Sequence, residues 1–96
     1  MYTVKLLTEA EIEITEACKW YEKKQRGLGK AFLNEIDHYL SLIAKEPLLF
    51  PIRFSEKYRF AVLKKFPYLI VFRIEDDKDL IYVNSVFHTS RNPINL

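Results

Sequence analysis

The chain has 96 residues, of which 49% are hydrophobic and 29% charged, and its formal net charge is +2. This length suits one compact core, so we expect residues 1–96 to form a single domain. The apolar runs are shorter than the roughly 20 residues that a membrane helix needs, and the apolar stretch of a signal peptide is missing, so we expect a cytoplasmic protein with no membrane partner. The single cysteine, Cys18, excludes an intrachain disulfide.

The N-terminal region predicts a strand that leads into a helix. Residues 2–7 alternate apolar and polar side chains, as a half-buried strand does. Thr8 and Glu11 have the spacing of a capping box, which predicts a helix start. Apolar residues then recur at helical spacing as far as Tyr21, with Glu13 expected on the solvent side.

A second helix is predicted from Leu28 or Gly29 until Pro47 stops it. Because the link after the first helix is short, the two helices should form an antiparallel hairpin. The apolar stripe of the second helix is Phe32, Leu33, Ile36, Leu40 and Ile43.

The second half of the chain predicts three strands. They cover residues 58–66, 68–74 and 80–88, with a polar turn at 75–79 and a connecting loop at 46–56. The order is therefore β-α-α-β-β-β, an α+β fold in which a helical hairpin packs on one face of a mainly antiparallel four-stranded sheet.

The last two predicted strands are apolar on both faces, which is unusual for an antiparallel sheet that is covered on one side. Two helices cover only one face, so the other face should expose an apolar groove for a partner. The alternatives are a dimer that buries this face, or extra core beneath the 46–56 loop.

Basic residues gather between positions 53 and 73, where Glu56 is the only acidic residue. Such a cluster suits a polyanion or an acidic protein, although a solvated strand face would look the same. The basic residues are Arg53, Lys57, Arg59, Lys64, Lys65 and Arg73.

His88 and Arg91 follow each other closely at the end of the last predicted strand. Cutting an RNA backbone requires a base for the 2′-hydroxyl, an acid for the leaving oxygen and cations for the phosphate. The candidates for these roles are His88, Lys64, Lys65, Arg59, Arg73 and Arg91. The structural alternative is that His88 bonds a turn and Arg91 packs on the sheet edge. His38 is expected to be a solvated helix residue, and neither a metal site nor a glycine-rich phosphate loop is indicated, so we expect no cofactor.

Several motifs, taken in their order along the chain, resemble the RelE/ParE superfamily. Its members are the toxin halves of bacterial type II toxin–antitoxin modules, many of them described as plasmid stabilisation proteins. The motifs are Leu-Leu-Phe-Pro ending at Pro51, Arg59 opening a strand, Phe66-Pro67-Tyr68 leading into residues 70–74, and the ending His88-x-x-Arg91-x-Pro93.

The resemblance implies a curved sheet on the helical hairpin, and an antitoxin whose C-terminal segment folds over the toxin in a hetero-oligomer. It also implies roles for the candidate residues. Arg59, Arg73 and Arg91 would contact phosphate or an acidic partner, and Lys64 and Lys65 would supply further positive charge. His88, with Arg73 and Arg91, would be catalytic only if the protein is a nuclease.

The resemblance leaves three functions open. ParE-like members inhibit DNA gyrase and are not enzymes in that role, whereas RelE-like members cut messenger RNA on the ribosome without metal; a third possibility is a non-toxic binding module with the same fold. Some ribosome-dependent relatives carry a tyrosine near the terminal histidine or arginine, where this chain has Thr89 and Ser90. We therefore expect a growth-inhibiting toxin of the ParE type.

Overall fold

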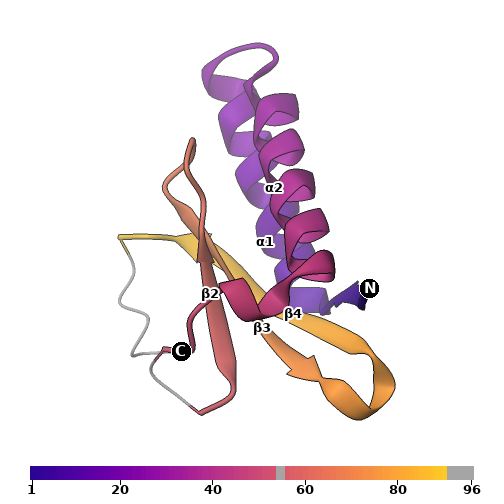
Figure 1. Ribbon diagram of the computed structural model, residues 1–96. Coiled ribbons are helices and arrows are strands. Elements are labelled where there is room, and N and C mark those ends of the chain that lie inside the picture. Colours follow the sequence, from indigo (N-terminus) through magenta and orange to yellow (C-terminus); the bar gives the residue numbers. More distant parts are fainter. Residues whose placement is uncertain (54–55, 91–96) are drawn as a thin grey trace.

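The computed structural model describes residues 1–53 and 56–90. Arg91 and Pro93, on which part of the predicted site rests, lie outside the described residues. The elements are β1 (Thr3–Leu6), α1 (Thr8–Lys24), α2 (Leu28–Lys45), β2 (Tyr58–Val62), β3 (Tyr68–Glu75) and β4 (Leu80–His88), with short 3-10 helices η1 (Pro47–Leu49) and η2 (Asp76–Lys78). This order confirms the predicted α+β fold (Figure 1).

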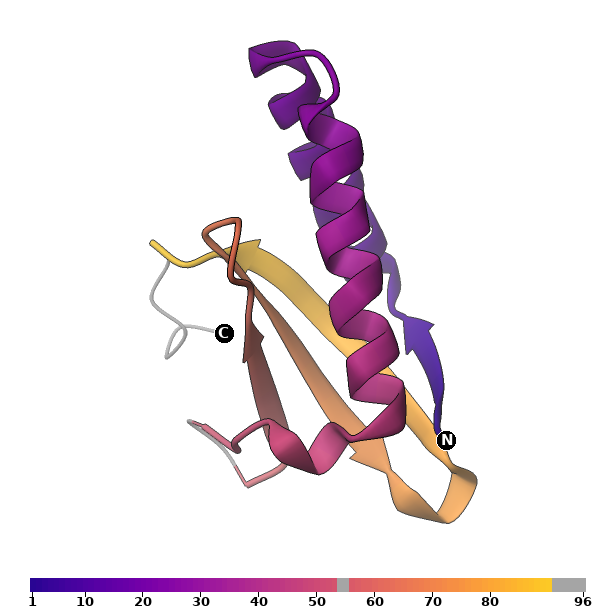
Figure 2. The same cartoon turned by 45° about the horizontal axis from the view of Figure 1, so that its top comes forward.

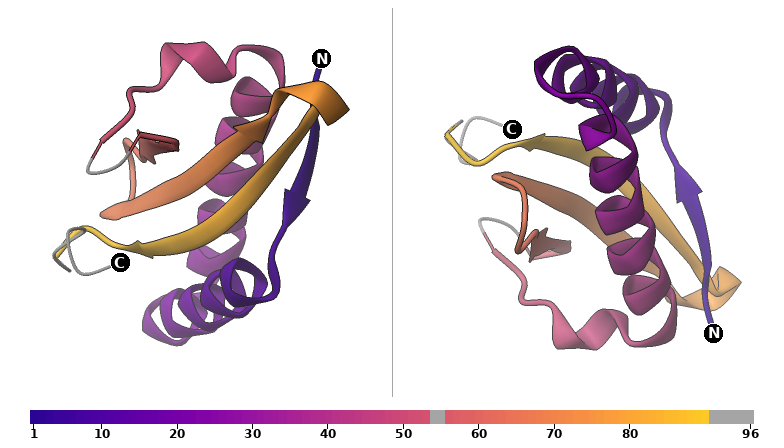
Figure 3. Two further views of the ribbon diagram at one scale, coloured as in Figure 1. Left: turned by 90° about the horizontal axis from the view of Figure 1, so that it is seen from below. Right: turned by 90° about the horizontal axis from the view of Figure 1, so that it is seen from above.

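The four strands form one curved sheet in the order β1-β4-β3-β2. β1 runs parallel to β4, and the other two pairs are antiparallel, so the sheet is mainly antiparallel as predicted. A parallel pair requires a crossover connection, and here the α1–α2 hairpin forms part of it. Figure 3 shows the hairpin lying across one face of the sheet.

The register between β3 and β4 shifts at one point. Val71 pairs with Ser85 and Phe72 with Val83, so Asn84 is an extra residue on β4. Such a bulge interrupts the alternation of side chains. Ser85 and Val86 therefore both reach the helix side, where Ser85 bonds to α1 and Val86 joins the core.

The main core lies between the hairpin and the sheet. It contains a group of four aromatic rings from both helices, the turn before β3 and the start of β3: Tyr21, Phe32, Phe66 and Tyr68. Neighbouring rings lie 4.9–6.2 Å apart between centroids and are mostly edge-to-face, a favourable arrangement. Beyond this core the tip of the hairpin extends past the sheet (Figure 2).

The tip of the hairpin is held by one carboxylate. Glu22 accepts hydrogen bonds from the backbone N–H groups of Gly27 and Gly29, at 3.0 Å each. Gly27 has a φ of 88°, which favours glycine. A Cβ on Gly29 would lie 2.8 Å from the Cys18 carbonyl oxygen, so the close approach of the helices depends on this glycine.

Three details of the helices differ from the predictions. The residue before the first turn of α1 is Leu7, whose side chain accepts no hydrogen bond, so the predicted capping box is wrong. Glu13 is only partly exposed to solvent, and its carboxylate bonds to β4. Leu33 is 38% exposed, and Glu35 is buried in the same turn of α2. Polar groups of β4 hold Glu13, and polar groups of the turn between β2 and β3 hold Glu35; hydrophobic periodicity does not detect such contacts.

The strands also differ in two respects. β2 ends at Val62 rather than at residue 66, because residues 63–67 form the turn into β3. The second face of the sheet does not expose the predicted apolar groove at its centre. Its residues Phe60, Leu69, Val71 and Phe87 are at most 6% exposed and form a small second core. In the described part of the chain, no helix is long and apolar enough to span a membrane.

Candidate functional site

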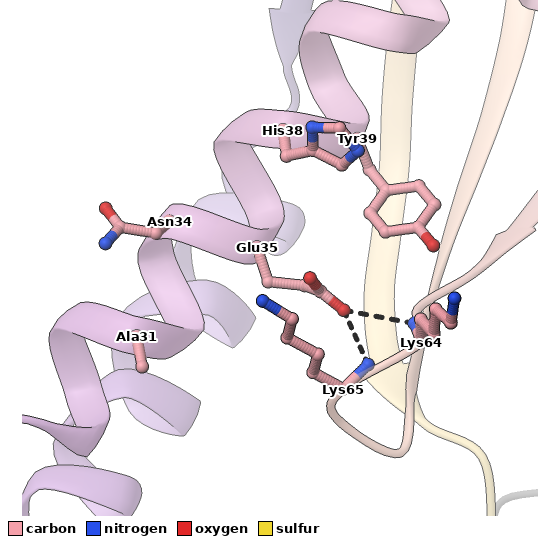
Figure 4. Close-up of a pocket in the computed structure, with 7 residues that line it drawn as sticks. All are labelled: Ala31, Asn34, Glu35, His38, Tyr39, Lys64 and Lys65. Carbon is pink, nitrogen blue, oxygen red and sulfur yellow. Dashed lines mark hydrogen bonds between the residues drawn. The ribbon is translucent and has the colours of Figure 1, made fainter.

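Two depressions flank the turn of residues 63–67. The first, which we call the basic pocket, has a volume of about 430 Å³ and lies between α2 and the turn. Figure 4 shows its lining side chains, with that of Lys65 directed back toward α2 and that of Lys64 directed away. The lining residues are Ala31, Asn34, Glu35, His38, Tyr39, Lys64 and Lys65.

Glu35 holds the backbone of the turn that forms one side of the basic pocket against α2. It is 7% exposed, and its Oε2 accepts hydrogen bonds from the backbone N–H groups of Lys64 at 3.0 Å and Lys65 at 2.6 Å (Figure 4). Two bonds from backbone donors supply the partners that a buried polar side chain needs. The two lysine side chains are thereby presented from a turn whose backbone is held on α2.

The second depression, which we call the aromatic groove, lies between α1 and the neighbouring ends of β3 and β4. Its volume is also about 430 Å³. One wall consists of α1 residues spaced so that they lie on one face of the helix, and the other consists of residues from the turn and the strand ends. The lining residues are Glu13, Glu16, Ala17, Trp20, Tyr21, Pro67, Tyr68, Val86 and His88.

Rings form a continuous row along the aromatic groove. The centroid distances are 5.0 Å from Trp20 to Tyr21, 6.2 Å from Tyr21 to Tyr68 and 5.3 Å from Tyr68 to His88. Burial raises the pKa of the Tyr21 phenol, and the neighbouring Tyr68 adds to this shift. Trp20 is 54% exposed, so the row is open to solvent at one end.

Glu13 connects the aromatic groove to the sheet. Its Oε1 accepts hydrogen bonds from the Ser85 hydroxyl at 2.8 Å and from the Val86 backbone N–H at 2.9 Å. Both donors lie at the bulge of β4, which exposes a backbone N–H and a hydroxyl toward α1. The bulge and Glu13 together set the distance between the two walls of the groove.

His88 is oriented by the residues that follow it. Its Nδ1 lies 3.1 Å from the backbone N–H of Ser90 and 2.8 Å from the Ser90 hydroxyl. Because the backbone N–H can only donate, the neutral ring accepts at Nδ1 and carries its hydrogen on Nε2. The predicted structural role of His88, a hydrogen bond to a turn, is therefore present in the structure.

Arg73 lies far from His88. His88 pairs with Tyr68 in the β3–β4 ladder, and Arg73 is five residues further along β3, about 17 Å away at the usual rise per residue. Arg73 lies on the opposite face from the neighbouring core residues Phe72 and Ile74. There it forms an ion pair with Glu75 at 3.2 Å and stacks 4.8 Å from the ring centre of Tyr82.

Arg59 lines neither the basic pocket nor the aromatic groove. Its guanidinium donates a hydrogen bond to the Phe50 carbonyl oxygen at 2.7 Å, which ties the segment after η1 to β2. The candidate cations among the described residues thus fall at two ends of the sheet. Lys64 and Lys65 share one end of the sheet with His88, while Arg59 and Arg73 lie toward the other end.

Residues 4–93 match the sequence profile of the family described as "ParE toxin of type II toxin-antitoxin system, parDE". The chain belongs to this family. It is therefore a toxin of a type II toxin–antitoxin system and a member of the RelE/ParE superfamily, which confirms the resemblance seen in the sequence. No curated protein matches the chain.

Solved structures show that this toxin shares its fold with both branches of the superfamily. It is similar to a chain of the chromosomal ParDE system from P. aeruginosa, with a TM-score of 0.77, 15% identity, and coverage of 92% of the toxin and 96% of that chain. It is also similar to a chain of the intact E. coli RelBE toxin–antitoxin complex, with a TM-score of 0.71, 19% identity, and coverage of 95% and 100%. A chain of the Mycobacterium tuberculosis RelBE2 complex is similar with a TM-score of 0.64 and 20% identity, and the match covers 91% of the toxin and 96% of that chain.

Sequence reasoning missed much of what lines the two depressions of the toxin. Glu35, Asn34 and Tyr39 were not singled out. His38 is exposed on α2, as expected for a solvated helix residue, and it also lines the basic pocket. Glu35 had a detectable signal, because helical spacing places its carboxylate beside the apolar residues Phe32 and Ile36. Among the described residues, no group of three or more His, Cys, Asp or Glu side chains could hold a metal ion.

Proposed function

We propose that this toxin inhibits DNA gyrase by binding to it, and that a cognate antitoxin neutralises the toxin in a hetero-oligomer. The observation that carries the choice of gyrase is the separation of His88 from Arg73 by about 17 Å along the sheet. Acid–base catalysis needs its groups within hydrogen-bond reach of the same reacting atoms. Inhibition by contact needs no such convergence.

The match to the ParE family supports this choice, and the ParDE and RelBE structures support an antitoxin partner. We assign the contact with gyrase to the basic pocket. Lys64 and Lys65 are exposed, and the backbone that carries them is fixed by Glu35, so little conformational entropy of the turn is lost on binding. Arg59 and Arg73, whose side chains are engaged within the protein, would contribute less.

The test is a supercoiling assay with purified gyrase and relaxed plasmid. The toxin should inhibit supercoiling, and the double variant Lys64→Glu/Lys65→Glu should need at least about tenfold more protein, because it opposes charges at the contact. A matched control is Lys23→Glu/Lys24→Glu, which reverses two exposed charges on α1 and should stay within about twofold. Full gyrase activity at a large excess of toxin would refute the proposal.

A second candidate, ribosome-dependent cleavage of messenger RNA, is favoured by one observation. Ser90 orients the ring of His88, the side chain that an RNA-cleaving site would use as its acid or base. Mapping of messenger RNA ends in a translating bacterial extract tests it. Cleavage within codons that disappears with His88→Ala would establish a nuclease, whereas intact message is the result expected for a gyrase inhibitor.

A further inference from the structure

The aromatic groove differs in charge from the rest of the sheet end on which it lies. Its described lining carries two carboxylates, Glu13 and Glu16, and neither a lysine nor an arginine. The basic pocket, on the other side of the same turn, has two lysines and one buried carboxylate. The groove is therefore unsuited to the polyanion that the basic residues would attract.

The rings and carboxylates together suit a cation. An ammonium or guanidinium group is attracted to the face of an aromatic ring, most strongly to that of tryptophan. Trp20 already has such a contact within the chain, since the Lys24 ammonium lies 4.9 Å from its ring centre. Glu16 is on the same face of α1 as Trp20, one turn away, so its carboxylate is close to a cation placed on the ring row.

We infer that the aromatic groove is the place where the antitoxin inserts a lysine or arginine side chain. This inference rests on the proposed neutralisation by a protein antitoxin. The ring row would contact the aliphatic part of that side chain, as rings commonly do, and Glu16 would pair with its charged end. Glu13 ties α1 to β4 through Ser85 and Val86, and so acts as a positioning residue.

Two other occupants of the aromatic groove are less suitable. A nucleic acid would bring phosphates toward two carboxylates, which opposes binding. A second copy of the toxin would have to present a basic side chain to the groove, and that would show as dimerisation that depends on Glu16. Both alternatives give results that differ from those expected for an antitoxin side chain.

The experiment measures the affinity of the full-length toxin for the protein encoded beside it, by calorimetry and in the absence of gyrase and ribosomes. Glu16→Lys should weaken binding at least about tenfold, because it places a like charge opposite the inserted side chain. Asp37→Lys is the matched control, since it makes the same charge change at an exposed site in the middle of α2, outside the groove lining, and should stay within about twofold.

Two further variants separate a ring contact from a general change in α1. Trp20→Ala should weaken binding by about fivefold or more, in line with the loss of a cation–π contact. Ile12→Ala, on the same helix and at 52% almost as exposed as Trp20, should have little effect. Each lysine and arginine of the antitoxin is then changed to glutamate, and one such change should restore binding to the Glu16→Lys toxin.

The outcomes distinguish the groove from the function. If the wild-type toxin does not bind the adjacent gene product, the proposed neutralisation and the groove assignment both fail. If it binds, but Glu16→Lys and Asp37→Lys bind equally well, only the groove assignment fails. Loss of a toxin dimer in Glu16→Lys, with unchanged antitoxin affinity, would also overturn the assignment in favour of self-association.

Discussion

The basic pocket and the aromatic groove are each stabilised by a helix glutamate that accepts two hydrogen bonds, in two different environments. In each, one glutamate of a helix accepts two hydrogen bonds: Glu35 of α2 from the amides of Lys64 and Lys65 in the turn between β2 and β3, and Glu13 of α1 from the Ser85 hydroxyl and the Val86 amide of β4. Glu35 is buried, whereas Glu13 is partly exposed. The comparison teaches that the same kind of hydrogen bonding between a helix and the sheet layer can support surfaces of opposite charge. The basic pocket presents lysines around the buried Glu35, whereas the aromatic groove presents rings beside carboxylates that are partly or fully exposed.

The largest effect on stability is expected from removing Phe32, a ring of the aromatic core that lies between the two depressions. Phe32 is fully buried and packs against Phe66 and Tyr68 at 5.3 Å and 5.2 Å between ring centroids. Phe32→Ala should lower the free energy of unfolding by about 3–5 kcal/mol. Leu33→Ala, at the next and 38% exposed position, should cost less than about 1 kcal/mol in the same denaturant titration. Equal losses would mean that the two positions are similarly packed.

The next effect concerns the buried acid. Glu35→Ala leaves the amides of Lys64 and Lys65 without their acceptor and should cost about 2–4 kcal/mol of unfolding free energy. Glu35→Gln keeps an acceptor oxygen and should cost less. Asp37→Ala, two residues along and exposed, is the control and should change stability little. A stable Glu35→Ala protein would show that the turn is held by other contacts.

Removing the corresponding carboxylate of the aromatic groove, that of Glu13, should lower the free energy of unfolding by less. Glu13→Ala removes the acceptor for Ser85 and Val86, but Glu13 is partly exposed, so water can replace part of the interaction and the cost should be about 1–2 kcal/mol. Glu16→Ala provides the control on the same helix. A loss larger than that of Glu35→Ala would reverse the ranking of the two attachments.

The smallest effect is a dependence of stability on alkaline pH. Burial raises the pKa of Tyr21 in the folded state, so the unfolded chain loses this proton first as pH rises. The contribution of Tyr21 to stability is therefore complete below the ordinary tyrosine value of about 10 and is lost as pH rises through the folded pKa. Denaturant titrations between pH 8 and 11 should show a steeper loss of stability in the wild type than in Tyr21→Phe. Parallel curves would mean that Tyr21 ionises equally easily in both states.

The elements of the fold were predictable because they follow local patterns. Helical periodicity and Pro47 defined α2, and alternating or continuous apolar runs defined the strands. The attachments were not predictable in this way. The partner of Glu13 depends on a bulge at Asn84, and the partners of Glu35 depend on a turn about thirty residues further along the chain.

The candidate site shows the same limit. Adjacency in sequence kept Lys64 and Lys65 together, but the sequence predicted them in a strand, whereas they lie in the turn between β2 and β3. It also could not show that Arg73 and His88 lie about 17 Å apart in the β3–β4 register. The aromatic groove combines residues from α1 with the ends of two strands, so no sequence window contains it. A composition of 15% Phe, Trp and Tyr indicates that rings are abundant, but not that three of them form a row with His88.

The measurement that tests the central claim most directly is the supercoiling of a reporter plasmid in cells that express the toxin without its antitoxin, compared with the His88→Ala variant. We predict growth arrest, a shift of the plasmid toward relaxed topoisomers, and the same shift with the variant, because contact with gyrase requires no acid–base group. Arrest with unchanged plasmid topology, abolished by His88→Ala, would contradict the account and identify an RNA-cleaving toxin instead.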